Sequence, residues 1–344
     1  MNSSGIWRKV PLSALLVVGV TALGLLAILA TGVGAVQIAP NDVVAGLWRG
    51  STGQPRSGPS DFIVWNLRAP RVLEAIVVGA GLALAGAIAQ AVVGNPIADP
   101  YVLGLSSGAG LGAVAVITTI GVGVAGSLTL PLAAFVTALL TGLVVLIMAR
   151  SGTRLDPSRI VMVGISVGSL LSGITSFLLL RTGNGDAARQ VMFWLLGSLS
   201  GAEWRLVIIS APLVLLAGGV ALLRAGRLNL LSLGDDSAAA LGMRPARARA
   251  GFFALAAFLT GVVVACSGTI GFVGLVMPAL ARVLVGADHR RVLPVAALLG
   301  ALLVLLADTA ARTILAPTEL PIGILTAFVG VPVFVLAVRR QASG

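Results

Sequence analysis

The sequence has few charged residues. Only 10% of its 344 residues are charged and 58% are hydrophobic, whereas about 25% of the residues in a soluble domain are charged. There are too few polar side chains to cover a surface that faces water. The composition therefore predicts a helical membrane protein whose apolar residues face lipid, and the 44 glycines suit helices that pack closely.

Several reactive groups are also nearly absent. The chain has one cysteine, Cys266, and one histidine, His289, which excludes an internal disulfide and most metal or haem ligand sets. Its one lysine, Lys9, lies near the N-terminus, and there is no phosphate-binding loop that ends in Gly-Lys-Ser/Thr. We therefore expect no catalytic, cofactor-binding or metal-binding residues and no ATP hydrolysis by this chain itself.

Long uncharged runs make up most of the chain. A helix needs about 20 apolar residues to cross a bilayer. Of the eight runs, 100–149 is long enough for two helices, whereas 250–281 is too long for one upright helix and short for two, which indicates two short helices with a break. The sequence thus predicts an all-α membrane protein of ten transmembrane helices in a single domain over 1–344. The break in the second run is expected where four helix-breaking residues lie: Gly268, Gly271, Gly274 and Pro278.

Two shorter expectations concern individual segments. The run at 11–36 follows Arg8 and Lys9 as in a signal peptide, but it is longer than a signal core, so we expect it to be retained as the first span. The apolar segment at about 191–199 is too short to cross a bilayer and is predicted to be an interfacial or re-entrant helix.

The basic residues indicate how the chain is oriented. The net charge is +11, but the basic residues are spread between apolar runs and not gathered in one patch, so we expect no nucleic-acid partner. With a cytoplasmic N-terminus, ten spans place 15 of the 23 basic residues on the cytoplasmic side, as the positive-inside rule requires. We expect a multi-pass inner (plasma) membrane protein, both termini cytoplasmic, with a cytoplasmic loop at about 224–249.

Two acidic residues lie near the ends of predicted spans, Glu74 and Asp308. They are either ion-coupling carboxylates of a secondary transporter or helix-end residues in ion pairs. Arg71 precedes Glu74 by three positions and Arg312 follows Asp308 by four, both spacings that place helix neighbours side by side. The sequence favours pairing, because a proton relay would more often have several acids along one path.

Small and hydroxylated residues gather in two further places, 95–110 and 164–169. Asp99 is placed to cap the helix that follows it. Hydroxyl and glycine faces suit either close helix packing or the lining of a polar pathway, and the sequence leaves both open. The candidate pathway residues are Ser106, Ser107, Gly164, Ser166, Gly168 and Ser169.

Seven segments occur in an order that resembles a known family. They are LRAPR at 67–71, the glycine-rich stretch 79–86 that leads to Gln90, NPIADP at 95–100, LGLSSGA at 103–109, GFVGLVMP at 271–278, DHRR at 288–291 and ELPIG at 319–323. From about residue 10 to 340 the chain closely resembles the FecCD family, the permease subunits of iron-siderophore, haem and cobalamin importers. Isoleucine at position 97 is a mild departure, because leucine is commoner there.

The resemblance implies an architecture and a set of partners. The expected fold is that of a type II ABC importer permease, with an internal inverted repeat. A second permease copy or paralogue, two cytoplasmic ATPase subunits and an extracytoplasmic substrate-binding protein are the implied partners, in contact with membrane lipid. The expected cargo is a ferric siderophore, then haem, then cobalamin. An ion-coupled secondary transporter is the alternative, and dependence of transport on ATP or on an ion gradient separates the two.

Two sets of residues resemble functional positions of the family. The first resembles its coupling helices, and physically Asp235 and Asp236 are placed to cap a short helix that Gly242 ends; a plain capped surface turn is the alternative. The coupling residues are Gly234, Asp235, Asp236, Ala239, Leu241 and Gly242. The second resembles arginines that meet acidic residues of the binding protein, and comprises Arg68, Arg71 and Arg312.

Overall fold

The protein is almost entirely helical in a computed structural model, which describes residues 11–34, 36–54, 58–121, 126–152, 154–316 and 318–342. In this part of the chain the only strands are β1 (Arg150–Ser151) and β2 (Arg154–Leu155), which form a small antiparallel hairpin. The longer helices are α1 (Leu12–Gly32), α4 (Ala69–Val93), α5 (Leu105–Thr119), α6 (Thr129–Ala149), α7 (Pro157–Thr182), α9 (Trp204–Leu223), α12 (Pro245–Ser267), α13 (Val273–Val285), α14 (His289–Thr313) and α15 (Ile322–Ala342).

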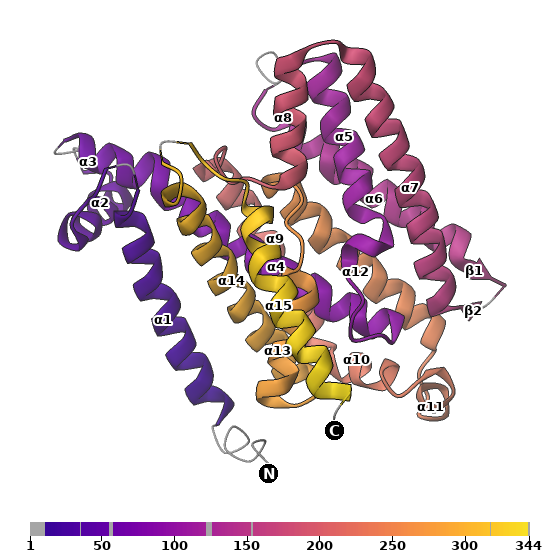
Figure 1. The fold of residues 1–344 in the computed structure, drawn as a ribbon. Helices are drawn as coiled ribbons and strands as arrows, with labels where there is room; N and C mark the ends of the chain where they lie inside the picture. The colour runs from indigo at the N-terminus through magenta and orange to yellow at the C-terminus, as the bar shows by residue number, and fades with distance from the viewer. Residues whose placement is uncertain are drawn as a thin grey trace.

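Shorter helices lie at the two ends of this bundle. They are α2 (Pro40–Thr52), α3 (Pro59–Phe62), the π-helical turn η3 (Ile63–Arg68), the 3-10 turn η4 (Pro100–Leu103), α8 (Gly185–Leu196), α10 (Ala225–Leu231) and α11 (Asp235–Ala240). Helices α2, α3 and α8 lie at one end of the bundle, whereas α10 and α11 lie at the other end, where α1 also begins and α15 ends (Figure 1).

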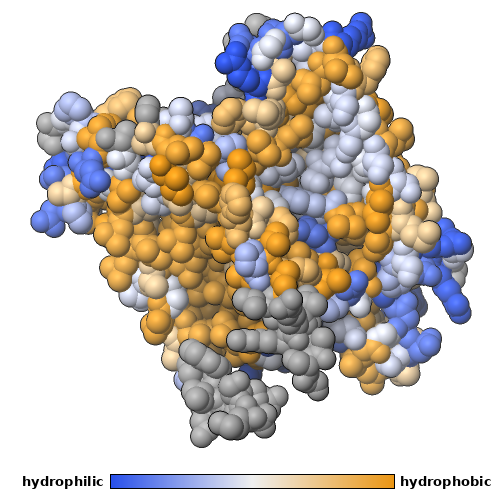
Figure 2. Space-filling model, viewed as in Figure 1, coloured by the Kyte–Doolittle hydropathy of each residue, from blue (hydrophilic) through white to orange (hydrophobic). Residues whose placement is uncertain are grey.

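The helices are apolar enough for a membrane. Among the described residues, seven helices are long and apolar enough to cross one, and three shorter apolar helices, α5, α13 and Ile322–Val335 of α15, complete the ten predicted segments. The surface between the two ends is largely hydrophobic, and polar residues gather at the ends (Figure 2). The helical membrane fold is thus confirmed, while the number of crossings stays a prediction.

Helix α4 runs through the centre of the bundle and is buried along most of its length. Glycine allows its two closest crossings. A Cβ atom on Gly79 would overlap the backbone carbonyl of Gly300 in α14, and one on Gly86 would overlap Gly274 in α13. The glycine-rich stretch of α4 therefore sets how closely these helices approach.

The predicted interruption between 250 and 281 is present. Helix α12 ends at Ser267 and α13 begins at Val273, so Gly268 and Gly271 lie in the break, whereas Gly274 and Pro278 lie inside α13. The short helix expected at about 191–199 begins earlier and also ends earlier, because the Asn184 side chain caps α8 by accepting from two backbone amides and Gly197, with a φ of 79°, ends it.

Candidate functional site

A cavity of about 450 Å³ lies where the interruption between α12 and α13 meets α8 and the start of α15. Helices α5 and α7 form its other walls. Hydroxyl groups, backbone and aromatic rings line it, and no lining residue is charged. The lining residues are Tyr101, Ser106, Ser107, Gly110, Ser172, Thr175, Ser176, Leu195, Leu196, Thr269, Gly271, Phe272 and Gly323.

Hydrogen bonds hold the interrupted segment in place. The Tyr101 hydroxyl donates to the Ile270 carbonyl and accepts from the Ile270 amide, each at 2.8 Å. The Thr269 hydroxyl donates to the Leu195 carbonyl at the end of α8. Side chains thus satisfy both backbone groups of Ile270 within the interruption and the Leu195 carbonyl at the end of α8, as a non-helical segment inside a membrane requires.

Phe272 has a rare backbone conformation. With a φ of 68° it is the only non-glycine residue of positive φ in the described chain, a conformation that costs energy for a bulky residue. Its side chain packs against Gly330 of α15, where a Cβ atom would overlap it. The Phe272 side chain therefore packs between the start of α13 and α15 at the edge of the cavity.

The predicted pathway residues divide into two groups. Ser106 and Ser107 line the cavity. Gly164 and Gly168 are buried and pack against η4 and the start of α5, so their position follows from close helix packing. Ser166 and Ser169 are exposed on α7 outside the cavity lining.

The sequence interpretation missed hydroxyls on the next two turns of α7. Ser172, Thr175 and Ser176 line the cavity, and Ser172 donates to Ser107 at 3.3 Å. Their spacing of three and four residues, which places side chains on one helix face, was the signal that could have identified them.

At the end of the bundle that carries α2 and α3, the three predicted arginines form one buried cluster. Arg71 donates to Asp308 at 2.9 Å and to both oxygens of Glu319 at 2.8 and 2.9 Å. The Arg312 Nε atom lies 3.1 Å from Asp308 Oδ2, at ion-pair distance but without hydrogen-bond geometry. Arg68 donates to the carbonyls of Thr31 and Gly32 at 2.9 Å and of Val36 at 2.5 Å.

The cluster has three guanidinium groups and two carboxylates, Asp308 and Glu319. Among the described residues no carboxylate pairs with Arg68, so its charge is hydrogen-bonded but not neutralised. A cavity of about 390 Å³ opens beside the three arginines and Glu319. The cluster therefore presents one unbalanced positive charge to this opening.

One of the two predicted ion pairs is confirmed and the other is wrong. Asp308 pairs with Arg312 as expected. Glu74 does not pair with Arg71; its carboxylate is fully buried against α9 and accepts from Ser210 at 3.1 Å. Arg71 meets the acids of α14 and the loop after it, which lie on another side of α4.

Helix α11 projects from the opposite end of the bundle, and only Ala238 within it is buried. The predicted capping is wrong: the helix begins at Asp235, both aspartates lie in its first turn, and neither caps it. The Asp235 carboxylate instead binds the guanidinium of Arg249 at 2.7 and 2.8 Å. Gly242 has a φ of 81° after the end of the helix, as its predicted role in ending the helix requires.

Arg249 was missed as a functional candidate. Its side chain is buried and also donates to the carbonyls of Val92, at 2.8 Å, and Leu155, at 3.1 Å. One guanidinium thus joins α11 to the end of α4 and to β2. The sequence showed it only as one of many basic residues in the loop.

A second connection fixes α10. Asn229 donates to Asp288 at 2.7 Å and accepts from the His289 amide at 2.9 Å, in the turn before α14. The hydrogen bond from Asn229 is the main cause that lowers the pKa of Asp288 below its ordinary value. Helices α10 and α11 are therefore each tied to the ends of spanning helices.

Comparison with known proteins identifies the family. The FecCD transport family model matches residues 21–340. The Fe(3+)-citrate import system permease protein YfmE of Bacillus subtilis (strain 168) is 38% identical over 336 residues, 97% of each chain. The hemin transport system permease protein HmuU of Yersinia pestis is 40% identical over 305 residues, 86% of this chain and 87% of the relative.

The fold agrees with this match. A structure described as an inward-facing conformation of a metal-chelate type ABC transporter superimposes with a TM-score of 0.83 at 30% identity, covering 95% of this chain and 99% of the other. The chain therefore belongs to the FecCD transport family.

Proposed function

We propose that the chain is the membrane-spanning permease subunit of an ATP-driven importer, and that its cargo is an iron complex. The uncharged, hydroxyl-lined cavity at the helix interruption carries the proposal. Relatives that are named for iron-citrate and hemin import support this class of cargo. A ferric siderophore or similar iron chelate is the first candidate, haem the second and cobalamin the third.

The cavity suits passage of a large ligand and not coupling to an ion. Hydroxyl groups and aromatic rings offer weak contacts to a bulky complex, while a proton or sodium site needs carboxylates or carbonyls aimed at the ion. Glu74 and Asp308 are both buried beside other partners, and neither lines the cavity. This disfavours the ion-coupled secondary transporter.

A second copy of the chain, or a paralogue, is the proposed partner beside this cavity. Helix α7 exposes Ser166 and Ser169 on the surface of the single chain, and small hydroxylated faces suit close contact between helices in a membrane. In Figure 2 a pale band of weakly polar residues crosses the orange surface of the lobe that contains α5 to α7. A facing copy would place a polar pathway between the two chains.

The energy source is tested by transport into proteoliposomes that contain the chain, its ATPase subunits and its binding protein. We expect uptake of a ferric siderophore to stop when ATP is withheld and to continue when ionophores collapse all ion gradients. Uptake that depends on a gradient and not on ATP would contradict the proposal.

The cavity is tested by filling it. We expect Ser172→Phe to lower uptake at least about tenfold with assembly unchanged, because the phenyl ring would occupy the cavity and steric overlap costs about 1–3 kcal/mol. The matched control is Thr21→Phe, because Thr21 is an exposed hydroxyl on α1, away from the cavity. Equal uptake by the two variants would rule out the cavity as the pathway.

We further propose that α10 and α11, on the cytoplasmic side, couple the chain to two ATPase subunits. Support comes from the exposure of Asp236, Ala239 and Leu241 on a short helix that Arg249 ties to α4 and β2. Gly242→Val would place a β-branched residue at a positive φ, which costs about 1–2 kcal/mol, and should weaken ATPase assembly. The control is Gly201→Val, because Gly201 has open space around it at the other end.

Normal assembly and normal ATP-driven uptake by the Gly242→Val variant would refute the coupling role. The orientation is tested separately. A reporter that is active only after export, fused after Gly344, should be inactive if both termini are cytoplasmic.

The cluster of Arg68, Arg71 and Arg312 is the proposed docking point for an extracytoplasmic binding protein. The unbalanced charge of Arg68 beside the open cavity supports an acidic partner, because a guanidinium binds a carboxylate through two hydrogen bonds. Charge reversal at Arg312 would also disrupt Asp308, so Arg68→Gln is the cleaner variant.

We expect Arg68→Gln to weaken binding-protein affinity at least about 30-fold, because truncating one partner of a buried charge pair at an interface costs about 2–5 kcal/mol. The residual affinity should depend less on salt than that of the wild type. Arg189→Gln is the control, because Arg189 is an exposed arginine of α8 at the same end. Unchanged affinity in a well-folded Arg68→Gln variant would assign the cluster to internal structure alone.

A further inference from the structure

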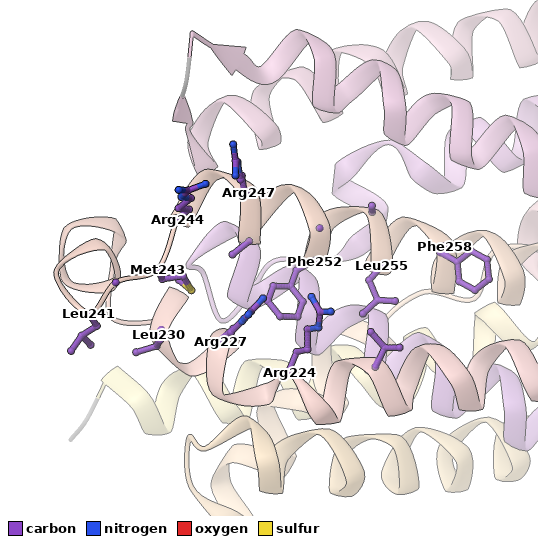
Figure 3. Close-up of a pocket in the computed structure, with 15 residues that line it drawn as sticks. Arg224, Arg227, Leu230, Leu241, Met243, Arg244, Arg247, Phe252, Leu255 and Phe258 are labelled. Carbon is purple, nitrogen blue, oxygen red and sulfur yellow. The ribbon is translucent and has the colours of Figure 1, made fainter.

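A groove of about 850 Å³ lies between α12 and the segment that joins α9 to α10. One part of its lining is basic, with Arg224 and Arg227 on the side of α10. The other part is apolar and follows α12 through Phe252, Leu255 and Phe258. Arg224 and Arg227 point toward Phe252 across the groove (Figure 3).

The charge in the groove is uncompensated. Two more arginines, Arg244 and Arg247, lie at the start of α12 on its rim (Figure 3), and no acidic residue is among the lining residues. None of the four arginines has an ion pair or a side-chain hydrogen bond within the described chain. Arg249 of the same helix differs, because Asp235 neutralises it.

The groove lies at a membrane boundary. Helices α9 and α12 are both long and apolar enough to span a membrane, and the arginines lie where α9 ends and α12 begins. The apolar wall then continues along α12 into its spanning part. Gly251 and Ala254 are exposed on this face of α12, and their small side chains leave it open.

We propose that this groove binds an anionic phospholipid, with the phosphate between Arg224 and Arg227 and an acyl chain along Leu255 and Phe258. Guanidinium groups bind phosphate oxygens through paired hydrogen bonds. Basic residues beside a membrane also attract acidic lipids. This lipid site shares no lining residue with the cavity that we propose as the pathway of the cargo.

The lining distinguishes a lipid from the other occupants. A soluble phosphate would use the arginines alone and leave the apolar wall without a partner. An ATPase subunit that docks on α10 and α11 would cover the exposed end of the groove but would not enter the part between α9 and α12. Only a molecule with a charged head and an apolar tail matches both parts of the lining.

The test is native mass spectrometry of the full-length chain with phosphatidylglycerol or phosphatidylcholine of identical acyl chains. The wild type should retain phosphatidylglycerol preferentially. Arg224→Gln with Arg227→Gln should weaken phosphatidylglycerol binding about 30-fold, since each arginine near an acidic headgroup contributes about a fivefold factor, and should leave phosphatidylcholine binding unchanged.

Two further variants make the result specific. Arg159→Gln with Arg291→Gln removes the same charge from exposed arginines outside the groove and should change binding less than about twofold, because these residues lie outside the phosphate site. Ala254→Trp fills the groove without changing its charge and should also weaken phosphatidylglycerol binding. Circular dichroism and thermal unfolding confirm that each variant is folded.

Three results would overturn the proposal. Equal retention of the two lipids by the wild type would remove the preference for an anionic headgroup. If Arg159→Gln with Arg291→Gln weakens phosphatidylglycerol binding as much as Arg224→Gln with Arg227→Gln does, the preference comes from general surface charge and not from the groove. Displacement of phosphatidylglycerol by inorganic phosphate, with Ala254→Trp binding normally, would assign the groove to a soluble anion.

Discussion

The two ends of the bundle use arginine in opposite ways. At the end that carries α2 and α3, Arg68, Arg71 and Arg312 are each about 8% exposed and are held by carboxylates or carbonyls. At the other end, the arginines that line the groove between α9, α10 and α12 are exposed and have no partner within the described chain. The cluster arginines are thus held by partners within the chain, and only the net charge of the cluster is unbalanced, whereas each groove arginine lacks such partners.

This difference shows what burial does to an ionised group. A charge removed from water must be paired or hydrogen-bonded, because desolvation costs several kcal/mol. A charge at the surface has no such requirement. Two arginines near the groove end of the bundle are exceptions. Arg249 joins several elements of the fold, and Arg282 of α13 donates to the Gln90 side chain of α4 and to the Pro96 carbonyl. The predictions below test this division.

The largest effect is expected from Asp308→Ala. Asp308 is fully buried and pairs with both Arg71 and Arg312, so its loss leaves two buried guanidiniums without their shared carboxylate. We expect the free energy of unfolding in mixed micelles to fall by about 3–5 kcal/mol. Glu319→Ala is the control, because its carboxylate is 39% exposed and its loss should cost clearly less. Equal losses of unfolding free energy in the two variants would show that the burial of a carboxylate does not determine how much it stabilises the fold.

A smaller effect is expected from Asp235→Ala. The Asp235 carboxylate is 46% exposed, and Arg249 keeps its bonds to the Val92 and Leu155 carbonyls. The free energy of unfolding should therefore fall by about 1.5–3 kcal/mol, less than for Asp308→Ala. The position of α11 should change more than the stability does, which cross-linking between α11 and an ATPase subunit can measure. Asp236→Ala is the matched control, because no salt bridge of Asp236 is present in the described chain. If Asp235→Ala and Asp236→Ala give the same unfolding free energy and the same cross-linking, Arg249 does not hold α11 in place.

The smallest effect is expected from Arg244→Gln with Arg247→Gln. Both side chains are exposed and have no partner in the described part of the chain. The free energy of unfolding should therefore change by no more than about 0.5 kcal/mol. Thermal unfolding in detergent checks this. A loss comparable with that of Asp308→Ala would abolish the distinction between the two ends.

Sequence patterns predicted several elements well because the responsible interactions are local. The break after Ser267 follows from glycines that lie within it. Asp99 caps η4 by accepting from the Tyr101 amide at 2.9 Å, and the pair of Asp308 and Arg312 follows from helix spacing. In each case the partners are within a few residues of one another.

The errors concern partners that are far apart in the chain. Glu74 binds Ser210 and not Arg71, and Asp235 binds Arg249 and not the amides of its own helix. Both acids had a plausible local partner, and tertiary packing supplied a better one. Local spacing cannot show which face of a helix meets which neighbour.

The sequence by itself determined that this protein lies in a membrane, that it is helical, where its long helices are interrupted, and which family it resembles. These properties depend on composition and on short motifs, which are readable along the chain. Only the tertiary structure decided which serines of α5 and α7 face the cavity, which arginines are buried and which remain free. The physical reason is that burial and pairing of a side chain depend on helices distant in sequence, and the energetic cost of an unpaired charge arises only once those helices have packed.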